Sequence, residues 1–251
     1  MDKFTRPILS GLLNKDSSNN STSYQGWRRF FGYAITEIIL VVLGILIAVA
    51  LNNWNENRKR SNELNSILQL VKSDLNQDIL ETNKVENYYE THRAFLESVL
   101  ASQYDRATFI DNKINAYVIM GFPELSLHRR GFQLLEQFNS EDVETHLNLS
   151  EELISFFYRS TQEVKADDEF RYTDQNQNFD YWKKTQDWWS EYLSNQGIDT
   201  FIEYALNDKD YRNRVASYYF FHYKVFLPEV LKYREKAQQQ IDLIDQVLNV
   251  N

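Results

Sequence analysis

The sequence predicts an all-α protein, in which one N-terminal transmembrane helix continues into an antiparallel helical bundle of four or five main helices. Three observations predict this class. Residues 30–51 form a single apolar run, FFGYAITEIILVVLGILIAVAL, in an otherwise polar chain. The 251 residues include only 7 Gly and 3 Pro, so long helices with few breaks are expected. No segment of any length shows the alternating pattern of a strand.

Three segments divide the chain. Residues 1–29 form an N-terminal tail, residues 30–51 the transmembrane helix, and residues 52–251 an acidic helical-bundle domain. The tail opens with a short amphipathic stretch, residues 1–15, that is expected to lie in the lipid headgroup layer. A polar linker, DSSNNSTS, follows at residues 16–23.

The apolar run is long enough to cross a bilayer. As a helix it extends over about 33 Å, against about 30 Å for the hydrocarbon core. Trp27 and Trp54 stand at its two ends, and Arg28 and Arg29 immediately precede it. Tryptophan and basic residues prefer the membrane–water interfaces, so these four residues are the expected interfacial anchors.

A cleaved signal peptide is the alternative interpretation, because residues 48–50 (AVA) resemble a cleavage site. The region before the apolar run is longer than a signal peptide allows, which favours a retained anchor. More Lys and Arg residues precede the run than follow it closely, which favours a cytoplasmic N-terminus. The bundle would then be periplasmic, in the inner membrane of a bacterium.

The bundle helices follow from apolar spacing and from breakers. Residues 52–102 predict a helix that continues the membrane helix. The apolar phase slips between Leu75 and Val85, so heptads are interrupted and a long coiled coil is not favoured. Residues 105–120 predict a second helix, and residues 125–138 a third.

The second half of the chain predicts two more long helices. Asn148 or Ser150 is expected to cap one that continues as far as residue 193, before the breaker NQG at residues 195–197. After a short helix at residues 200–206, Asn207 or Asp208 is expected to cap the last helix, which runs to about residue 248 with a kink at Pro228.

Two aromatic groups invite two interpretations each. Residues 218–223 (YYFFHY), together with Phe226, are apolar nearly all round, which predicts a fully buried helix or else a groove for a partner helix or ligand. Trp182, Trp188 and Trp189 are expected in the core, with an exposed docking patch as the alternative.

Charge and composition exclude several functions. The first 60 residues carry a net charge of +4 and the rest −13, against −9 for the whole chain. An acidic domain argues against a nucleic-acid partner, whose phosphates require a basic surface. The absence of Cys excludes disulfides, thiol catalysis and thiolate metal sites.

No catalytic, cofactor or metal motif stands out. None of the four His residues has a Glu three positions before it, so the Glu-x-x-His pairs of di-iron bundles are absent. Asp142 and His146 lie four residues apart and are expected to pair rather than to hold a metal. Residues 167–169 (DDE) are interpreted as a solvated face. No catalytic residue and no cofactor are therefore predicted.

Glu37 is the one ionisable residue inside the apolar run, where a charge is costly. Gly44 and Ala48 lie on the same helical face, in a small-x-x-x-small pattern that lets helices approach closely. We expect this face to contact a second copy or another protein. Interfacial snorkelling of Glu37 and a proton-coupled role are the alternatives.

Residues 33–60, YAITEIILVVLGILIAVALNNWNENRKR, closely resemble the signature of an uncharacterised family of single-pass helical proteins common in Bacteroidota. Thr36 departs from the usual glycine at that position. The resemblance implies the anchored helical architecture and an inner-membrane location, and it implies no activity.

The expected function is that of a membrane-anchored helical interaction or scaffold protein without catalytic activity. A sensor-like ligand-binding bundle that signals through a partner is the alternative.

Overall fold

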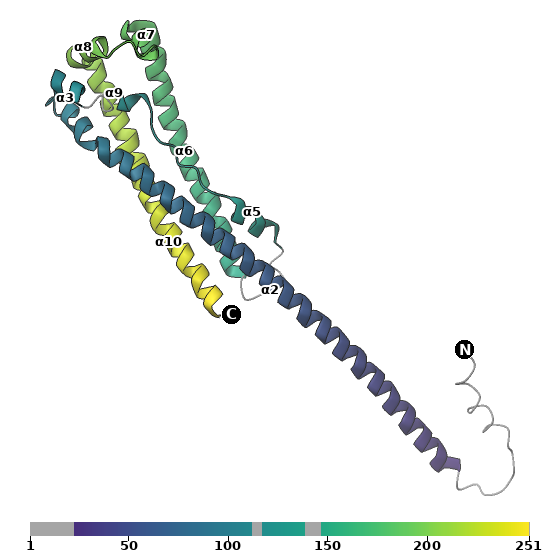
Figure 1. Ribbon diagram of the computed structural model, residues 1–251. Helices are drawn as coiled ribbons and strands as arrows, with labels where there is room; N and C mark the ends of the chain where they lie inside the picture. The colour runs from purple at the N-terminus through teal and green to yellow at the C-terminus, as the bar shows by residue number, and fades with distance from the viewer. Residues whose placement is uncertain (1–22, 112–116, 139–146, 251) are drawn as a thin grey trace. The chain divides into compact units, whose positions relative to one another are not determined.

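The structure is a computed structural model that describes residues 23–111, 117–138 and 147–250, with side chains for residues 31–110, 117–138 and 148–249. Every regular element in these ranges is helical, so the predicted all-α class is confirmed (Figure 1). The chain forms two compact units, Met1–Arg58 and Lys59–Asn251. Helix α2, Ser23–Leu100, contributes residues to both units.

In the first unit, α2 carries the apolar run. Within the described residues, it is the one helix that is long and apolar enough to cross a membrane. None of the residues in its most apolar 18-residue window is buried inside the protein. A fully exposed apolar helix surface requires an apolar surrounding, as a bilayer provides. The helix is therefore compatible with a single membrane span.

The second unit contains the remaining helices and the C-terminal part of α2. The elements after α2 are, in chain order, α3 (Arg106–Asp111), the 3-10 turn η1 (Val118–Met120), α5 (Arg130–Gln137), α6 (Leu147–Thr185), α7 (Trp188–Leu193), α8 (Asp199–Asn207), α9 (Lys209–Tyr219), the π-helical segment η4 (Phe220–Phe226) and α10 (Leu227–Val250).

Three long helical columns build this unit, formed by α2, by α6, and by α9, η4 and α10 together (Figure 1). The third column runs antiparallel to α2, because Lys72 pairs with Asp245 whereas Glu97 accepts a hydrogen bond from Tyr219. Helix α6 runs in the same direction as α2, since Leu153 near its start shares a buried cluster with Leu64, and Trp182 near its end shares the other cluster with Val99. The third column is thus antiparallel to both α2 and α6, which are parallel to each other.

The buried side of α2 is an uninterrupted seam. Eleven of its buried positions alternate in steps of four and three residues: Leu64, Leu68, Val71, Leu75, Asp78, Thr82, Val85, Tyr89, His92, Leu96 and Val99. This is the 3.5-residue period of a heptad. Ile67, Asp74 and Phe95 are buried beside this seam. The predicted phase slip between Leu75 and Val85 is wrong, because Asp78 and Thr82 occupy the seam there as buried polar residues.

Those polar residues separate two apolar clusters. One cluster lies near the start of the unit and includes Leu64, Leu153 and Ile244. The other lies towards the end of α2 and includes Trp182 and Phe201. All three columns contribute to both clusters, so apolar burial holds them together along their length.

The prediction for residues 105–138 needs correction. Instead of one helix over residues 105–120, the structure has the six-residue α3 and the three-residue turn η1. Helix α5 begins at Arg130, five residues later than predicted, because residues 121–129 are not helical. The backbone N–H groups of His128 and Gly131 donate to carboxylates of α2 instead of starting a helix earlier.

Helix α6 also differs at both ends. Its described part begins at Leu147, so Asn148 and Ser150 lie within the helix and do not cap it. It ends at Thr185, and α7 follows as a separate helix up to Leu193. The predicted stop after residue 193 is confirmed, because Asn195 and Gly197 both have positive φ angles.

Near Pro228 the helix widens. Asp208 caps α9 by accepting a hydrogen bond from the N–H of Asp210, as predicted. The π-helical segment η4 then ends two residues before Pro228. Proline has no N–H to bond the carbonyl four residues earlier, and a wider turn accommodates that loss. At the position of the predicted kink, the structure changes from a π-helix to an α-helix.

Candidate functional site

The predicted membrane contact face lies on the exposed surface of α2. Glu37, Gly44 and Ala48 are all exposed, and the helix brings them onto one side as the spacing predicted. A Cβ atom added at Gly44 meets nothing within 4 Å. The Thr36 hydroxyl bonds the Gly32 carbonyl within the helix, over 2.8 Å. This surface therefore has room for a neighbouring helix.

Of the predicted interfacial anchors, only Trp54 lies among the described side chains. It is 61% exposed, and the Arg58 guanidinium carbon lies 5.8 Å from the centre of its ring. This geometry is a cation–π contact at the end of the apolar run. Trp27, Arg28 and Arg29 lie outside the residues whose side chains the structure describes.

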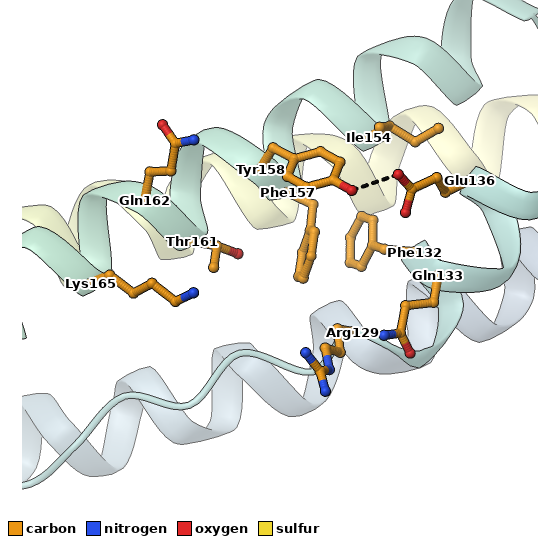
Figure 2. A pocket seen from close by; sticks show the side chains of 10 residues that line it. All are labelled: Arg129, Phe132, Gln133, Glu136, Ile154, Phe157, Tyr158, Thr161, Gln162 and Lys165. Carbon is orange, nitrogen blue, oxygen red and sulfur yellow. Dashed lines mark hydrogen bonds between the residues drawn. The ribbon is translucent and has the colours of Figure 1, made fainter.

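A groove between α5 and α6 was not predicted from the sequence (Figure 2). Its volume is about 360 Å³, within the range of ligand-binding pockets. Residues from α5, from the position just before it and from the first half of α6 line the groove: Arg129, Phe132, Gln133, Glu136, Ile154, Phe157, Tyr158, Thr161, Gln162 and Lys165. The residues that line the groove come from two helices that meet only in the folded chain, so no local sequence motif identifies the groove.

A buried chain of hydrogen bonds lies deeper in the bundle. Arg171 is 1% exposed, and its Nη1 donates to the Tyr89 hydroxyl over 3.2 Å and to the Pro123 carbonyl over 3.3 Å. The Tyr89 oxygen lies 2.8 Å from His222 Nδ1. Because the tyrosine oxygen accepts from arginine, its own proton is free for the histidine nitrogen. His222 is therefore held as a neutral acceptor.

Arg171 is balanced by charge and by aromatic rings. It forms an ion pair with Asp168, one turn earlier on α6. Its guanidinium carbon lies 3.4 Å from the ring centre of Phe226 and 4.4 Å from that of Phe122. Residues 167–169 were interpreted as a solvated face, which is wrong for Asp168 because its carboxylate neutralises this buried cation.

The pKa of His222 falls to about 2, first because burial disfavours the charged ring and second because Arg171 lies nearby. In the unfolded chain an ordinary pKa of about 6.5 applies, so the folded state loses stability as the pH falls below about 6.5. We expect the free energy of unfolding to drop by about 2 kcal/mol between about pH 6.5 and pH 5 on this account.

The measurement is chemical denaturation of wild type and His222→Gln at both pH values. Glutamine keeps an oxygen that accepts the Tyr89 hydroxyl proton but does not titrate. The variant should lose about 2 kcal/mol less than wild type over this interval, whatever its stability at the higher pH. Equal losses in the two proteins would show that His222 does not titrate as described.

Asp78 anchors the non-helical segment to α2. Its carboxylate accepts hydrogen bonds from the backbone N–H of His128 over 2.8 Å, from His128 Nδ1 over 2.7 Å, and from the Tyr233 hydroxyl. Burial raises the pKa of Asp78, and these hydrogen bonds oppose the rise. One buried side chain of α2 thus joins residues from two other segments.

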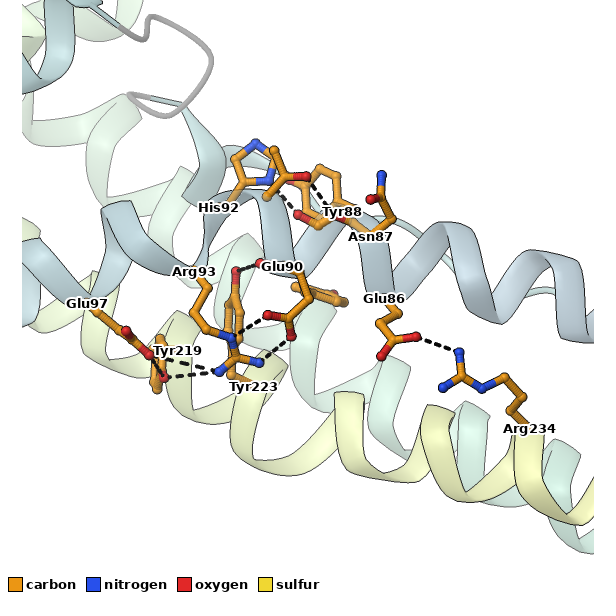
Figure 3. A network of polar contacts seen from close by, with 12 residues as sticks. Glu86, Asn87, Tyr88, Glu90, His92, Arg93, Glu97, Tyr219, Tyr223 and Arg234 are labelled. Atoms are coloured by element: carbon orange, nitrogen blue, oxygen red, sulfur yellow. Dashed lines mark hydrogen bonds and ion pairs between the residues drawn. The ribbon is translucent and has the colours of Figure 1, made fainter.

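A polar network on the outer side of α2 joins it to the third column (Figure 3). Arg93 forms an ion pair with Glu90 at 2.6 Å and also lies over the ring of Tyr223. Tyr219 stacks on Tyr223 and donates to Glu97 over 2.7 Å. These contacts hold η4 and its neighbours against α2.

The structure confirms the predicted burial of one aromatic group and corrects that of the other. Trp182 and Trp188 are buried and Trp189 packs against the same cluster, which confirms the expected core position. The tract at residues 218–226 is not buried on all sides, because Phe220 is 55% exposed. Asp142 and His146 lie outside the described residues. Within the described residues no cluster of His, Asp and Glu is arranged to hold a metal ion.

Comparison with known proteins adds one match. Residues 37–102 match the model of a family of unknown function (DUF6090), in agreement with the expected similarity to an uncharacterised family. The match covers the part of α2 from Glu37 onward and two residues after it. No curated protein matches the chain, and no solved structure matches it.

Proposed function

We propose that this chain is a membrane-anchored helical interaction or scaffold protein that acts without catalysis, and that α2 anchors it in the inner membrane of a bacterium. The observation that carries this proposal is the apolar window of α2, which has no burial inside the protein. Such a surface is stable in a bilayer and unstable in water.

The interior of the bundle supports an architectural role. Two arginines in the bundle form ion pairs one helical turn away: the buried Arg171 with Asp168, and the half-buried Arg214 with Asp210 at 2.6 Å. Each arginine also donates a hydrogen bond to another helix, Arg171 to Tyr89 of α2 and Arg214 to Asn178 of α6, so the paired charges help to fix how the helices meet. The third column and α2 are joined by further contacts on the outer side (Figure 3).

The proposed contact in the membrane uses the face formed by Glu37, Gly44 and Ala48. Close approach of a second helix at Gly44 would shield the Glu37 carboxyl from lipid and offer it a hydrogen-bond partner. The occupant is a second copy of the chain or the membrane helix of another protein.

Replacing Gly44 by Leu is expected to weaken self-association about fivefold, since helix contacts in membranes contribute about 1 kcal/mol each. A Cβ atom added at Gly44 meets nothing within 4 Å in the single chain, so the effect of the larger side chain is expected at the neighbouring helix. The chain contains no Cys, so single Cys residues introduced along residues 33–51 report helix proximity by disulfide crosslinking in membranes.

The matched control is Val42→Leu, which enlarges a side chain on another face of the same helix. Wild type should crosslink with helical periodicity that peaks near Gly44 and Ala48. The control should keep this pattern, and Gly44→Leu should lose it. Weak crosslinking without periodicity, unchanged by Gly44→Leu, would contradict self-association and leave α2 as a solitary anchor.

The proposed orientation places the N-terminus in the cytoplasm and the bundle in the periplasm, on the strength of the basic residues before the apolar run. A reporter enzyme that is active only in the periplasm, fused after Asn251, is expected to be active. Activity of a cytoplasm-only reporter at the same position would reverse the orientation.

A second candidate function is ligand sensing through a partner. The observation that favours it is the groove between α5 and α6, whose volume suits a small molecule.

A further inference from the structure

The groove between α5 and α6 has an aromatic wall. Phe132 of α5 and Phe157 of α6 stack with their ring centres 4.4 Å apart and their planes inclined by 16° (Figure 2). Both rings line the groove, but Phe132 is only 2% exposed, so the half-buried side chains of Phe157 and Ile154 provide most of the accessible apolar surface. Aromatic walls of this kind bind flat apolar bodies, because rings gain contact area and favourable offset or edge contacts.

Two cations border the same space. Arg129 precedes α5, and Lys165 lies on α6 two turns after Tyr158. Figure 2 shows both side chains directed towards the open space beside the two phenylalanine rings. Neither forms an ion pair with any carboxylate in the described part of the chain, although residues 61–251 carry a net charge of −13.

The groove contains one carboxylate, and it is already engaged. Glu136 accepts a hydrogen bond from the Tyr158 hydroxyl over 2.6 Å, at the end of the groove away from Lys165 (Figure 2). Thr161, which also lines the groove, has a buried hydroxyl with no hydrogen-bond partner in the described structure. Such a hydroxyl favours a ligand that supplies the missing partner.

We propose that this groove binds a small aromatic carboxylate. The ring of the ligand lies against Phe157 and Ile154, and its carboxylate lies between Arg129 and Lys165. The Thr161 hydroxyl donates to the ligand. The aromatic wall selects a flat ligand, and the two cations select a negatively charged one. Charge-assisted hydrogen bonds are stronger than hydrogen bonds between neutral groups.

This site goes beyond the scaffold role and does not depend on it. Loss of ligand binding would leave the crosslinking pattern of the membrane helix unchanged, and loss of crosslinking would leave ligand binding unchanged.

The test uses the full chain in phosphatidylcholine nanodiscs, with 2-naphthoate as the probe and 2-naphthamide as its neutral counterpart. Both have the same ring system and differ in charge. Isothermal titration should give saturable binding of 2-naphthoate, corrected for empty nanodiscs, and at least about tenfold weaker binding of 2-naphthamide.

Two variants locate the site. Lys165→Met keeps the length of the side chain without its charge and should weaken naphthoate binding about tenfold. Thr161→Val should weaken binding several-fold while the melting temperature stays the same or rises, because it removes a buried hydroxyl without a partner. The matched control is Lys183→Met, an exposed lysine on the same helix outside the groove, which should bind like wild type.

Three results would overturn the proposal. The first is no saturable binding at probe concentrations up to about 1 mM. The second is equal affinity for 2-naphthoate and 2-naphthamide, which would remove the role of charge. The third is an affinity in Lys165→Met equal to that in Lys183→Met, which would place binding elsewhere.

Discussion

Replacement of Gly131 by Ala is expected to lower the free energy of unfolding of the bundle by about 3 kcal/mol. A Cβ atom at this position would lie 2.6 Å from the backbone nitrogen of Val71 and 2.7 Å from its Cα atom. Backbone atoms in the middle of α2 cannot move aside as a side chain can, so α5 must shift away. That shift also weakens the 2.7 Å hydrogen bond from the Gly131 N–H to Asp74.

Thermal unfolding of the full chain in a mild detergent measures this effect. Trp182 and Trp188 are buried in the bundle, so their fluorescence reports its unfolding. A loss of about 3 kcal/mol corresponds to a fall in melting temperature of roughly 6–12 °C for a domain of this size. Gly121→Ala is the control, because a Cβ atom there meets nothing within 4 Å. Similar melting temperatures for the two variants would contradict the close approach of α5 to α2.

Replacement of Arg171 by Met is expected to cost about 3 kcal/mol as well, for an electrostatic reason. The variant removes a buried cation and leaves the Asp168 carboxylate without its partner. It also removes the donor to the Tyr89 hydroxyl and to the Pro123 carbonyl. Removing one member of a buried pair is costly because the remaining charge stays partly desolvated.

A double-mutant cycle separates charge from packing. Chemical denaturation of Arg171→Met, Asp168→Asn and the double variant gives the coupling energy between the two residues. The double variant should be destabilised by clearly less than the sum of the single variants. Arg159→Met, an exposed arginine on the same helix, should stay within about 0.5 kcal/mol of wild type. A cost for Arg171→Met as small as that of Arg159→Met would contradict the structural role of the buried cation.

The heptad seam of α2 illustrates why sequence patterns were misread. Eleven positions from Leu64 to Val99 keep the 3.5-residue period. Asp78, Thr82 and His92 occupy buried positions of the seam with polar side chains. The pattern of apolar residues is therefore interrupted at these positions, although the buried surface is continuous. Asp78 is recognised as a seam residue only when its donors, His128 and Tyr233, are in place.

The candidate site residues also differ in whether the sequence alone predicts that they lie together. Glu37, Gly44 and Ala48 share one face of a single helix, and helical spacing alone places them together. The groove residues Phe132 and Phe157 belong to helices separated by residues 139–146, which the structure does not describe. Their stacking depends on how α5 and α6 pack, and no spacing in the sequence predicts it.

The sequence by itself determined the helical class, the apolar run and the acidic character of the bundle, because these depend on composition and on periodicity within one helix. It also placed the breaker after residue 193 and limited the cap of the last helix to Asn207 or Asp208, which are local effects of backbone geometry. Only the tertiary structure decided that residues 121–129 are not helical and that residues 220–226 form a π-helix. In both segments the local preference for an α-helix competes with contacts to distant residues. At residues 121–129 the carboxylates of α2 outweigh that preference, and such contacts exist only in the folded chain. At residues 220–226 the missing N–H of Pro228 weakens the α-helical bonding, and the aromatic packing around His222 adds to that effect.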